Sequence, residues 1–235
     1  MISALCTGGV VARAVDRGLL DLKVWNPREY VDTDYAAVDD RPYGGGPGMV
    51  MMVEPLVKAI RSAKKEQAGS FLTIYMSPQG IPITQKLINR LSSFDGLIIL
   101  SGRYEGIDER VIELEVDEEY SLGDYVISGG ELAAMVLTDA VARQCDNVLG
   151  DADSAKQDSF MTGLLDWSHY TRPTEYEGLK VPEVLCSGDH EKIRRWRIQQ
   201  ALVRTMRKRP DLLAQRELSE EEQTLLEEYL TEKEK

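Results

Sequence analysis

Acidic and basic side chains gather in residues 102–111 (GRYEGIDERV), directly after the apolar run of residues 96–100. The segment also holds two glycines, Gly102 and Gly106, and the aromatic residue Tyr104. In an open α/β sheet, ligands bind at the loops that follow the carboxyl ends of the strands, and glycines let the backbone approach a ligand. The spacing therefore favours a ligand-binding loop, with a solvated charged turn as the alternative.

Two further glycine-rich segments occur at residues 39–49 (DDRPYGGGPGM) and 123–132 (GDYVISGGEL). Neither contains the G-x-G-x-x-G pattern of a dinucleotide-binding fold or the G-x-x-x-x-G-K-[ST] pattern of a P-loop, so an ordinary NAD or ATP enzyme is disfavoured. Loops at expected strand ends remain at residues 77–80, 102–106 and 122–130. Backbone amides and carbonyls from such loops can form a pocket for a small molecule.

The hydrophobic pattern predicts the elements that position these loops. Apolar, β-branched runs predict strands at residues 22–25, 71–76, 96–100 and 125–128. Amphipathic patterns predict helices at residues 53–63, 84–94, 107–113 and 130–144. This alternation predicts a mostly parallel sheet covered by helices on both faces. Residues 146–157 lose the pattern and predict a linker, after which apolar residues return at helical spacing.

Amino-acid composition limits the classes of protein to which the chain can belong. The chain has 235 residues, of which 43% are hydrophobic and 29% charged, and this fits one large or two smaller globular domains. No run approaches 18 apolar residues and the start lacks the shape of a secretory signal, so we expect a cytoplasmic protein without a membrane span. The three cysteines show no C-x-x-C spacing and do not group with His169 or His190, so neither a zinc site nor a disulfide framework is predicted.

The charge distribution matters more than the net charge. A net charge of −12 argues against a nucleic-acid partner, because phosphates are neutralised by lysine and arginine. Acids gather at residues 113–119 and from residue 217 onward, however, while residues 192–209 carry the basic residues Lys192, Arg194, Arg195, Arg197, Arg204, Arg207, Lys208 and Arg209. Such a patch can bind RNA locally, and a solvated helix face is the alternative.

Taken together, the strings DDRPYGGGPGM, GRYEGIDERV and GDYVISGGEL resemble those of the bacterial tRNA (guanine-N1-)-methyltransferase family, knotted proteins of the SPOUT class. The resemblance continues to residues 193–197 and covers nearly the whole chain. It implies an α/β fold with a mostly parallel sheet, a C-terminal trefoil knot in that domain, and a small all-α C-terminal domain. The implied bounds are 1–147 for the methyltransferase domain, 148–166 for a flexible linker and 167–235 for a helical tRNA-binding domain.

The resemblance also implies the reaction. A cytoplasmic homodimer would transfer a methyl group from S-adenosyl-L-methionine to N1 of the guanosine at tRNA position 37, next to the anticodon. Mg²⁺ is implied as a possible aid, for which the sequence offers no identifiable ligands. Neither a membrane nor DNA is an expected partner. The rival hypothesis is a non-catalytic RNA-binding module that keeps the knot and has lost turnover.

Methylation at guanine N1 requires a base that removes the N1 proton and a cation that meets the charge developing on the neighbouring carbonyl oxygen. The resemblance implies that Asp158 is the base and Arg143 the cation. Spacing alone predicts a helix N-cap for Asp158 and a cation at a helix C-terminus for Arg143.

The resemblance further assigns binding residues. The donor would be bound by Tyr75, Met76, Ser77, Pro78, Gly102, Tyr104, Glu105, Gly106, Leu122, Gly123, Tyr125, Ile127, Gly129 and Gly130. The tRNA would be bound by Asp39, Gly48, Arg172, Arg194 and Arg195.

The sequence departs from the family pattern at three places. About ten residues, the length of a strand and a turn, are expected before the position aligned with Met1, and their loss would weaken the sheet. Ala133 stands where the family has proline, which loosens the start of that helix modestly. Trp167 and Ser168 replace a Cys-Pro pair. Neither substitution removes a reacting group.

Overall fold

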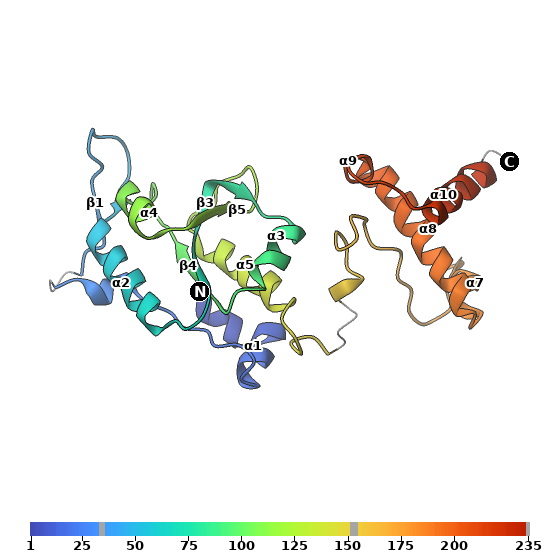
Figure 1. Ribbon diagram of the computed structural model, residues 1–235, viewed down its shortest axis with the longest axis horizontal. Helices are drawn as coiled ribbons and strands as arrows, with labels where there is room; N and C mark the ends of the chain where they lie inside the picture. The colour runs from blue at the N-terminus through green and yellow to red at the C-terminus, as the bar shows by residue number, and fades with distance from the viewer. Residues whose placement is uncertain (33–35, 151–154, 234–235) are drawn as a thin grey trace. The chain divides into compact units, whose positions relative to one another are not determined.

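The computed structural model describes residues 1–32, 36–150 and 155–233. The chain divides into two compact units, Met1–Ala152 and Asp153–Lys235 (Figure 1). The expected linker, residues 148–166, spans this division, and its residues 151–154 lie outside the described part of the chain. Among the described residues, no helix is both long enough and apolar enough to cross a membrane.

The first unit is built on a three-stranded sheet in the order β4-β3-β5, with strands β3 (Phe71–Pro82), β4 (Gly96–Ser101) and β5 (Glu118–Ser121). Both pairings are parallel, which confirms the predicted parallel sheet. The register between β3 and β5 shifts between Met76 and Ile81. Residues 77–80 therefore leave the regular ladder at the carboxyl end of the strand.

Helices cover both faces of this sheet, because successive side chains of a strand point to opposite faces. On one face Tyr75 and Leu100 pack with α2 (Val53–Glu66) and α4 (Glu109–Glu115). On the other face Ile74 and Met76 pack with α3 (Gln85–Leu91) and α5 (Glu131–Ala142) (Figure 1). The helices thus fix the two faces and leave the strand ends to form the site.

Smaller elements complete the first unit. The helical turn η1 (Ile2–Cys6) and helix α1 (Gly9–Asp16) pack against α5, and the turn η2 (Pro27–Tyr30) packs against α2. The short strands β1 (Asp39–Asp40) and β2 (Val50–Met51) pair antiparallel and enclose the glycine-rich loop.

The second unit is mainly helical. Helix α8 (His190–Lys208) begins where the Asp189 side chain accepts a hydrogen bond from the Lys192 backbone N–H at 3.1 Å, an N-cap that satisfies an otherwise unpaired donor. Further helices in the described part of this unit include α7 (Glu183–Cys186), α9 (Pro210–Ala214) and α10 (Glu220–Lys233). The core of the unit contains Leu164, Ala201, Leu202 and Leu225.

The expectation of an all-α second domain is wrong in one detail. Strands β6 (Glu175–Tyr176) and β7 (Leu179–Lys180) form an antiparallel hairpin. Its two turn residues, Glu177 and Gly178, have φ values of 51° and 80°. Positive φ at both central positions is typical of the turn that matches the twist of a two-residue hairpin.

Two predicted strands are absent from the described fold. Residues 22–25 have no strand partner, and Lys23 instead forms surface ion pairs with Asp21 and Glu66. Residues 125–128 form a loop, because their apolar side chains line a cavity rather than pack between strands. Strand β5 was missed, since its acidic sequence is typical of a solvated run.

Candidate active site

A cavity of about 430 Å³ lies at the carboxyl ends of β3, β4 and β5. Its walls come mainly from residues 75–79, 102–107, 119–122 and 125–130. All of the predicted donor-binding residues except Gly123 line it. Gly123 lies just outside, where its N–H donates to the Ser121 hydroxyl at 3.1 Å and shapes the turn. The three strand-end loops therefore meet, while their role in donor binding stays a prediction.

Two glycines bring the end of β4 against the start of α5. The Gly130 N–H donates to the Gly102 carbonyl at 2.7 Å. A β-carbon on Gly130 would lie 2.9 Å from the Ser101 Cα and 3.0 Å from the Gly102 nitrogen, which is closer than real contacts allow. The floor of the cavity is thus backbone against backbone, with no room for a side chain at this point.

Tyr75 forms part of the wall beneath Gly102. A β-carbon on Gly102 would lie 2.8 Å from the Tyr75 hydroxyl. Burial raises the pKa of Tyr75, and the carboxylates of Glu119 and Glu109 raise it further. The phenol therefore stays protonated and neutral at physiological pH, and it faces the cavity as a hydrogen-bond donor.

The glycine-rich loop between β1 and β2 is joined by backbone hydrogen bonds to residues 102–106, which are the predicted donor loop. The Glu105 N–H donates to the Met49 carbonyl at 3.0 Å, and the Met51 N–H donates to the Gly106 carbonyl at 3.0 Å. Gly48 has a φ of +77°, and a β-carbon there would lie 2.4 Å from the Glu105 carboxylate. The predicted tRNA residues Asp39 and Gly48 therefore belong to a hairpin that packs directly on the predicted donor loop.

The cavity also contains residues that were not among the predicted donor-binding residues. Gln79, Glu109 and Glu119 line it beside the predicted residues. Arg103, also in the lining, donates from Nε to the Glu131 carboxylate at 2.5 Å, which ties the donor loop to the first turn of α5. The acidic run of residues 113–119 carried a signal for Glu119, but a solvated run has the same composition.

The two predicted catalytic residues lie in different units. Arg143 is the C-cap of α5, and its backbone N–H donates to the Asp139 carbonyl at 3.1 Å. It lines a second, more open hollow with Leu132 and Val136, and it is not in the lining of the cavity at the strand ends. Asp158 belongs to the second unit, where its carbonyl accepts from the Met161 N–H at 3.3 Å. Their roles as base and cation stay predictions.

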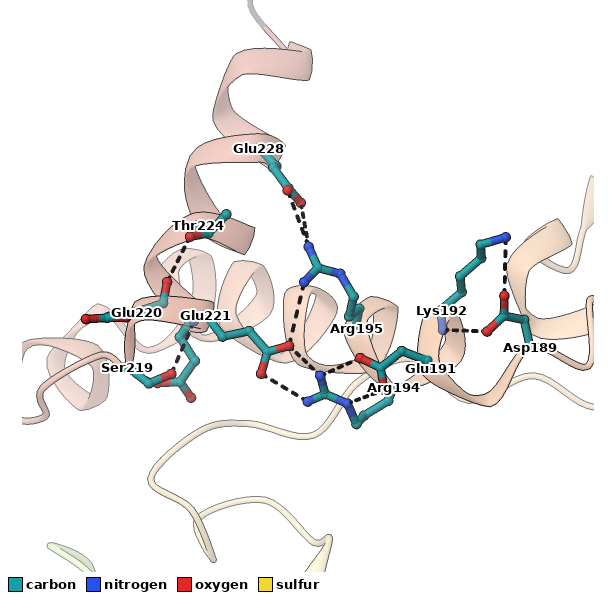
Figure 2. Close-up of polar contacts among 11 residues, drawn as sticks. Asp189, Glu191, Lys192, Arg194, Arg195, Ser219, Glu220, Glu221, Thr224 and Glu228 are labelled. Atoms are coloured by element: carbon teal, nitrogen blue, oxygen red, sulfur yellow. Dashed lines mark hydrogen bonds and ion pairs between the residues drawn. The ribbon is translucent and has the colours of Figure 1, made fainter.

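The predicted phosphate-binding arginines of α8 are paired within the second unit (Figure 2). Arg194 donates to Glu191 at 2.8 Å and to Glu221 at 3.1 Å, and Arg195 lies 3.3 Å from the Glu228 carboxylate. Hydrogen bonds to Glu191 and then Glu221 raise the pKa of Arg194, and its guanidinium lowers the pKa of Glu221. Arg172, which precedes a cis peptide bond to Pro173, is exposed.

Within the described ranges, no group of three or more histidine, cysteine, aspartate or glutamate side chains could hold a metal ion. Glu105, Glu109 and Glu119 line the cavity without forming such a group. The described side chains therefore do not form a ready cage for Mg²⁺, and no chemical step is assigned to it.

The fold and the cavity define a ligand-binding α/β unit of the kind found in enzymes, in which strand-end loops enclose a small molecule. The chain belongs to the family described as tRNA (Guanine-1)-methyltransferase TrmD, whose model matches residues 1–215. The resemblance stated from the sequence motifs is thereby confirmed.

Individual relatives agree with the family match. The chain is 55% identical over 236 residues to the tRNA (guanine-N(1)-)-methyltransferase of Nitrosospira multiformis, covering 97% of this chain and 92% of the relative. It is 56% identical over 230 residues to the enzyme of that name from Stutzerimonas stutzeri, covering 98% and 92%. For Aeromonas salmonicida the identity is 55% over 232 residues, covering 99% and 93%.

Proposed function

We propose that this protein is a tRNA (guanine-N1-)-methyltransferase that methylates the guanosine at position 37, next to the anticodon. The observation that carries the proposal is identity of about 55% over nearly the full length to relatives of that name, across both structural units. The match to the family model extends from residue 1 to residue 215, just past α9, which supports retention of the donor-binding and RNA-binding parts together.

The cavity supports S-adenosyl-L-methionine as the methyl donor. Its volume of about 430 Å³ lies within the range of about 300–1,000 Å³ that is typical of small-molecule sites. Its glycines expose backbone groups that suit an adenine edge, while Glu105, Glu109 and Glu119 supply negative charge. The donor carries a positive sulfonium, so this acidic lining attracts it electrostatically and favours it over the neutral thioether product.

In the proposed mechanism the donor supplies a methyl group bound to a sulfonium. Asp158 accepts the N1 proton of guanine, which leaves an electron pair on N1 for attack on the methyl carbon, while the carbon–sulfur bond breaks and its electron pair stays on the departing neutral thioether. Arg143 stabilises the negative charge that spreads to the adjacent carbonyl oxygen. The cavity loops hold the donor still and exclude water, so that the two reacting atoms meet in one orientation.

A homodimer is part of the proposal. Leu132 and Val136 of α5 are 49% and 52% exposed, whereas Ala133 and Leu137 on the other side of that helix are buried against the sheet. Large apolar side chains that gather on an exposed face are typical of interaction surfaces. A second copy packed on this face would cover the hollow that Arg143 lines, and it would bring that residue into a site shared by two subunits.

The remaining assignments follow the family. We propose that the SPOUT trefoil knot is formed by the loops of the cavity, with residues 1–147 as the methyltransferase domain. Residues 148–166 would be the linker, and residues 167–235 would bind tRNA through Arg172, Arg194 and Arg195. The proposed location is the cytoplasm, on the ground that tRNA is the substrate. Any stimulation by Mg²⁺ would act through ligands that are not assigned.

The test is methyl transfer to a defined transcript. Wild-type protein, S-adenosyl-L-methionine and a tRNA transcript with guanosine at position 37 should yield one 1-methylguanosine per tRNA by mass spectrometry of nucleosides. A transcript with adenosine at that position should stay unmodified. Binding of tRNA with no methylated product would favour the rival hypothesis of a non-catalytic RNA-binding module.

A further inference from the structure

The arginines of α8 are occupied by partners inside the second unit. Arg194 and Arg195 form ion pairs with glutamates of α10. The Arg207 guanidinium lies 5.4 Å from the ring centroid of Tyr229, which also belongs to α10. Arg197 lies 5.0 Å from the ring centroid of Trp167. The basic segment of residues 192–209 is therefore not a freely solvated surface, and its residues Arg194, Arg195 and Arg207 contact α10.

Helix α10 is held firmly enough to present its acids to α8. Leu225 is 2% exposed and packs in the core with Ala201 and Leu202 of α8. The Gln199 side chain adds a hydrogen bond to the Leu225 carbonyl at 3.0 Å. This anchorage places Glu221 one turn before the core contact and Glu228 one turn after it, so both carboxylates lie along the α8 arginines (Figure 2).

The ion pairs themselves are weak enough to exchange. The side chains of Arg194 and Glu221 are 47% and 37% exposed, and those of Arg195 and Glu228 are 39% and 48% exposed. Water and salt screen such pairs, and each changes an equilibrium by no more than about fivefold. A phosphate offers arginine the same bidentate geometry as a carboxylate. A polyanion can therefore replace the glutamates without unpacking the core.

We propose that α10 occupies the phosphate-binding surface of α8 with its own carboxylates, and that tRNA phosphates displace Glu221 and Glu228 from Arg194 and Arg195. This inference rests on the proposed function. Its consequence is selectivity. An RNA that contacts only α8 must compete with Glu221 and Glu228 for the arginines. A tRNA that also binds the methyltransferase unit gains further binding free energy there, and this offsets the cost of displacing the two glutamates.

The alternative roles of the carboxylates predict different results. If Glu221 and Glu228 orient the arginines for RNA, their removal should weaken tRNA binding. If they only stabilise the helix pair, tRNA affinity should follow net charge alone. Competition predicts that their removal strengthens tRNA binding beyond the effect of net charge.

The experiment compares two full-length variants with the same change in charge. Glu221→Gln/Glu228→Gln removes both pairing carboxylates. Glu220→Gln/Glu227→Gln is the matched control on the same helix, because neither of its acids is paired with α8 among the described ion pairs, and Figure 2 shows Glu220 pointing away from the arginines. Fluorescence anisotropy with a tRNA transcript measures the Kd of each protein at several salt concentrations.

The pairing variant should bind tRNA about two- to fivefold more tightly than the control at low salt, and this gain should shrink as salt screens the pairs. Equal affinity of the two variants, or weaker binding by the pairing variant, would overturn the inference while leaving the proposed function intact. Wild-type protein that binds no tRNA at any salt concentration would overturn both. If the double variant unfolds, Glu228→Gln alone should show the same direction against Glu227→Gln.

A double-mutant cycle gives an independent check. In an Arg194→Gln background, Glu221→Gln should strengthen tRNA binding less than in the wild-type background, because only the longer contact of Glu221 with Arg195, at 3.7 Å, then remains to be displaced. An undiminished gain in that background would show that Glu221 acts as a general negative charge, and it would contradict displacement.

Discussion

Substitution of Gly130 by alanine tests whether the backbone contact between β4 and α5 forms the floor of the donor site. Gly130 has an ordinary φ of −70°, so the backbone itself accepts alanine without strain. The added methyl would lie 2.9 Å from the Ser101 Cα and 3.0 Å from the Gly102 nitrogen, both of which are backbone atoms. Relief of this contact requires that the end of β4 and the start of α5 move apart.

Overpacking of this kind costs about 1–3 kcal/mol. If the substitution destabilises only the donor-bound state, donor affinity should fall by about fivefold to 150-fold, because each 1.4 kcal/mol changes the dissociation constant about tenfold. If it destabilises the folded state, the melting temperature should drop by about 2–4 °C per kcal/mol in a unit of this size. Isothermal calorimetry with S-adenosyl-L-methionine and thermal unfolding together measure both parts.

Gly129→Ala is the matched control. Its added methyl would meet the Glu131 carboxylate at 2.5 Å and the Arg103 side chain at 3.3 Å, and the ends of such side chains can move. We therefore expect a smaller loss than for Gly130→Ala. The reasoning is refuted if Gly130→Ala keeps donor affinity within twofold of wild type and melts unchanged, or if Gly129→Ala is the more damaging substitution.

Three further predictions concern the donor wall, the buried ion pair and the shared site. Gly102→Val should abolish donor binding in calorimetry, because its side chain would overlap Tyr75, and unchanged affinity in a folded variant would move the donor elsewhere. Burial raises the pKa of Glu115, but hydrogen bonds from Lys64 and Arg61 outweigh it and lower the pKa overall, so Glu115→Gln should lose about 1.5–3 kcal/mol of unfolding free energy at pH 7. That difference should decline in urea titrations as the pH falls below about 4.3, where the carboxylate of the unfolded chain takes up a proton, and it should be lost once the pH lies below the lowered pKa of the folded state. Mixing inactive Asp158→Asn with inactive Gly102→Val subunits should restore partial methyl transfer, and an exchanging mixture that stays inactive would place a complete site in each chain.

The sheet and its helices could be predicted where one physical signal dominated. Strand β4 follows from an uninterrupted apolar run, and α2 from an amphipathic pattern that extends slightly further than predicted, to Glu66. Strand β5 could not, because Glu118 looks solvated in the sequence and is instead neutralised by Arg90, which donates to it at 2.9 Å. The prediction of a strand at residues 125–128 was wrong for the opposite reason. These residues look buried between strands in the sequence, but their apolar side chains line a cavity.

The loops that form the site could be predicted from the sequence, but the hydrogen bonds and ion pairs between its side chains could not. Glycines at strand ends marked residues 102–106 and residues 129–130, and the fold brings both to one cavity. The bond from Arg103 to Glu131 and the internal pairing of Arg194 depend on side chains far apart in sequence, for which no local pattern exists. The basic composition of α8 therefore could not reveal that Arg194 and Arg195 are already paired with glutamates of α10.

The central claim is that the protein methylates guanine N1 with Asp158 as the base, and single-turnover methyl transfer by Asp158→Asn tests it most directly. Donor affinity in calorimetry should match wild type, because the cavity loops are unchanged. The rate of 1-methylguanosine formation on a saturating tRNA transcript should fall by about 10²- to 10⁴-fold. A rate within a few-fold of wild type would contradict the account, because it would show that another group removes the N1 proton.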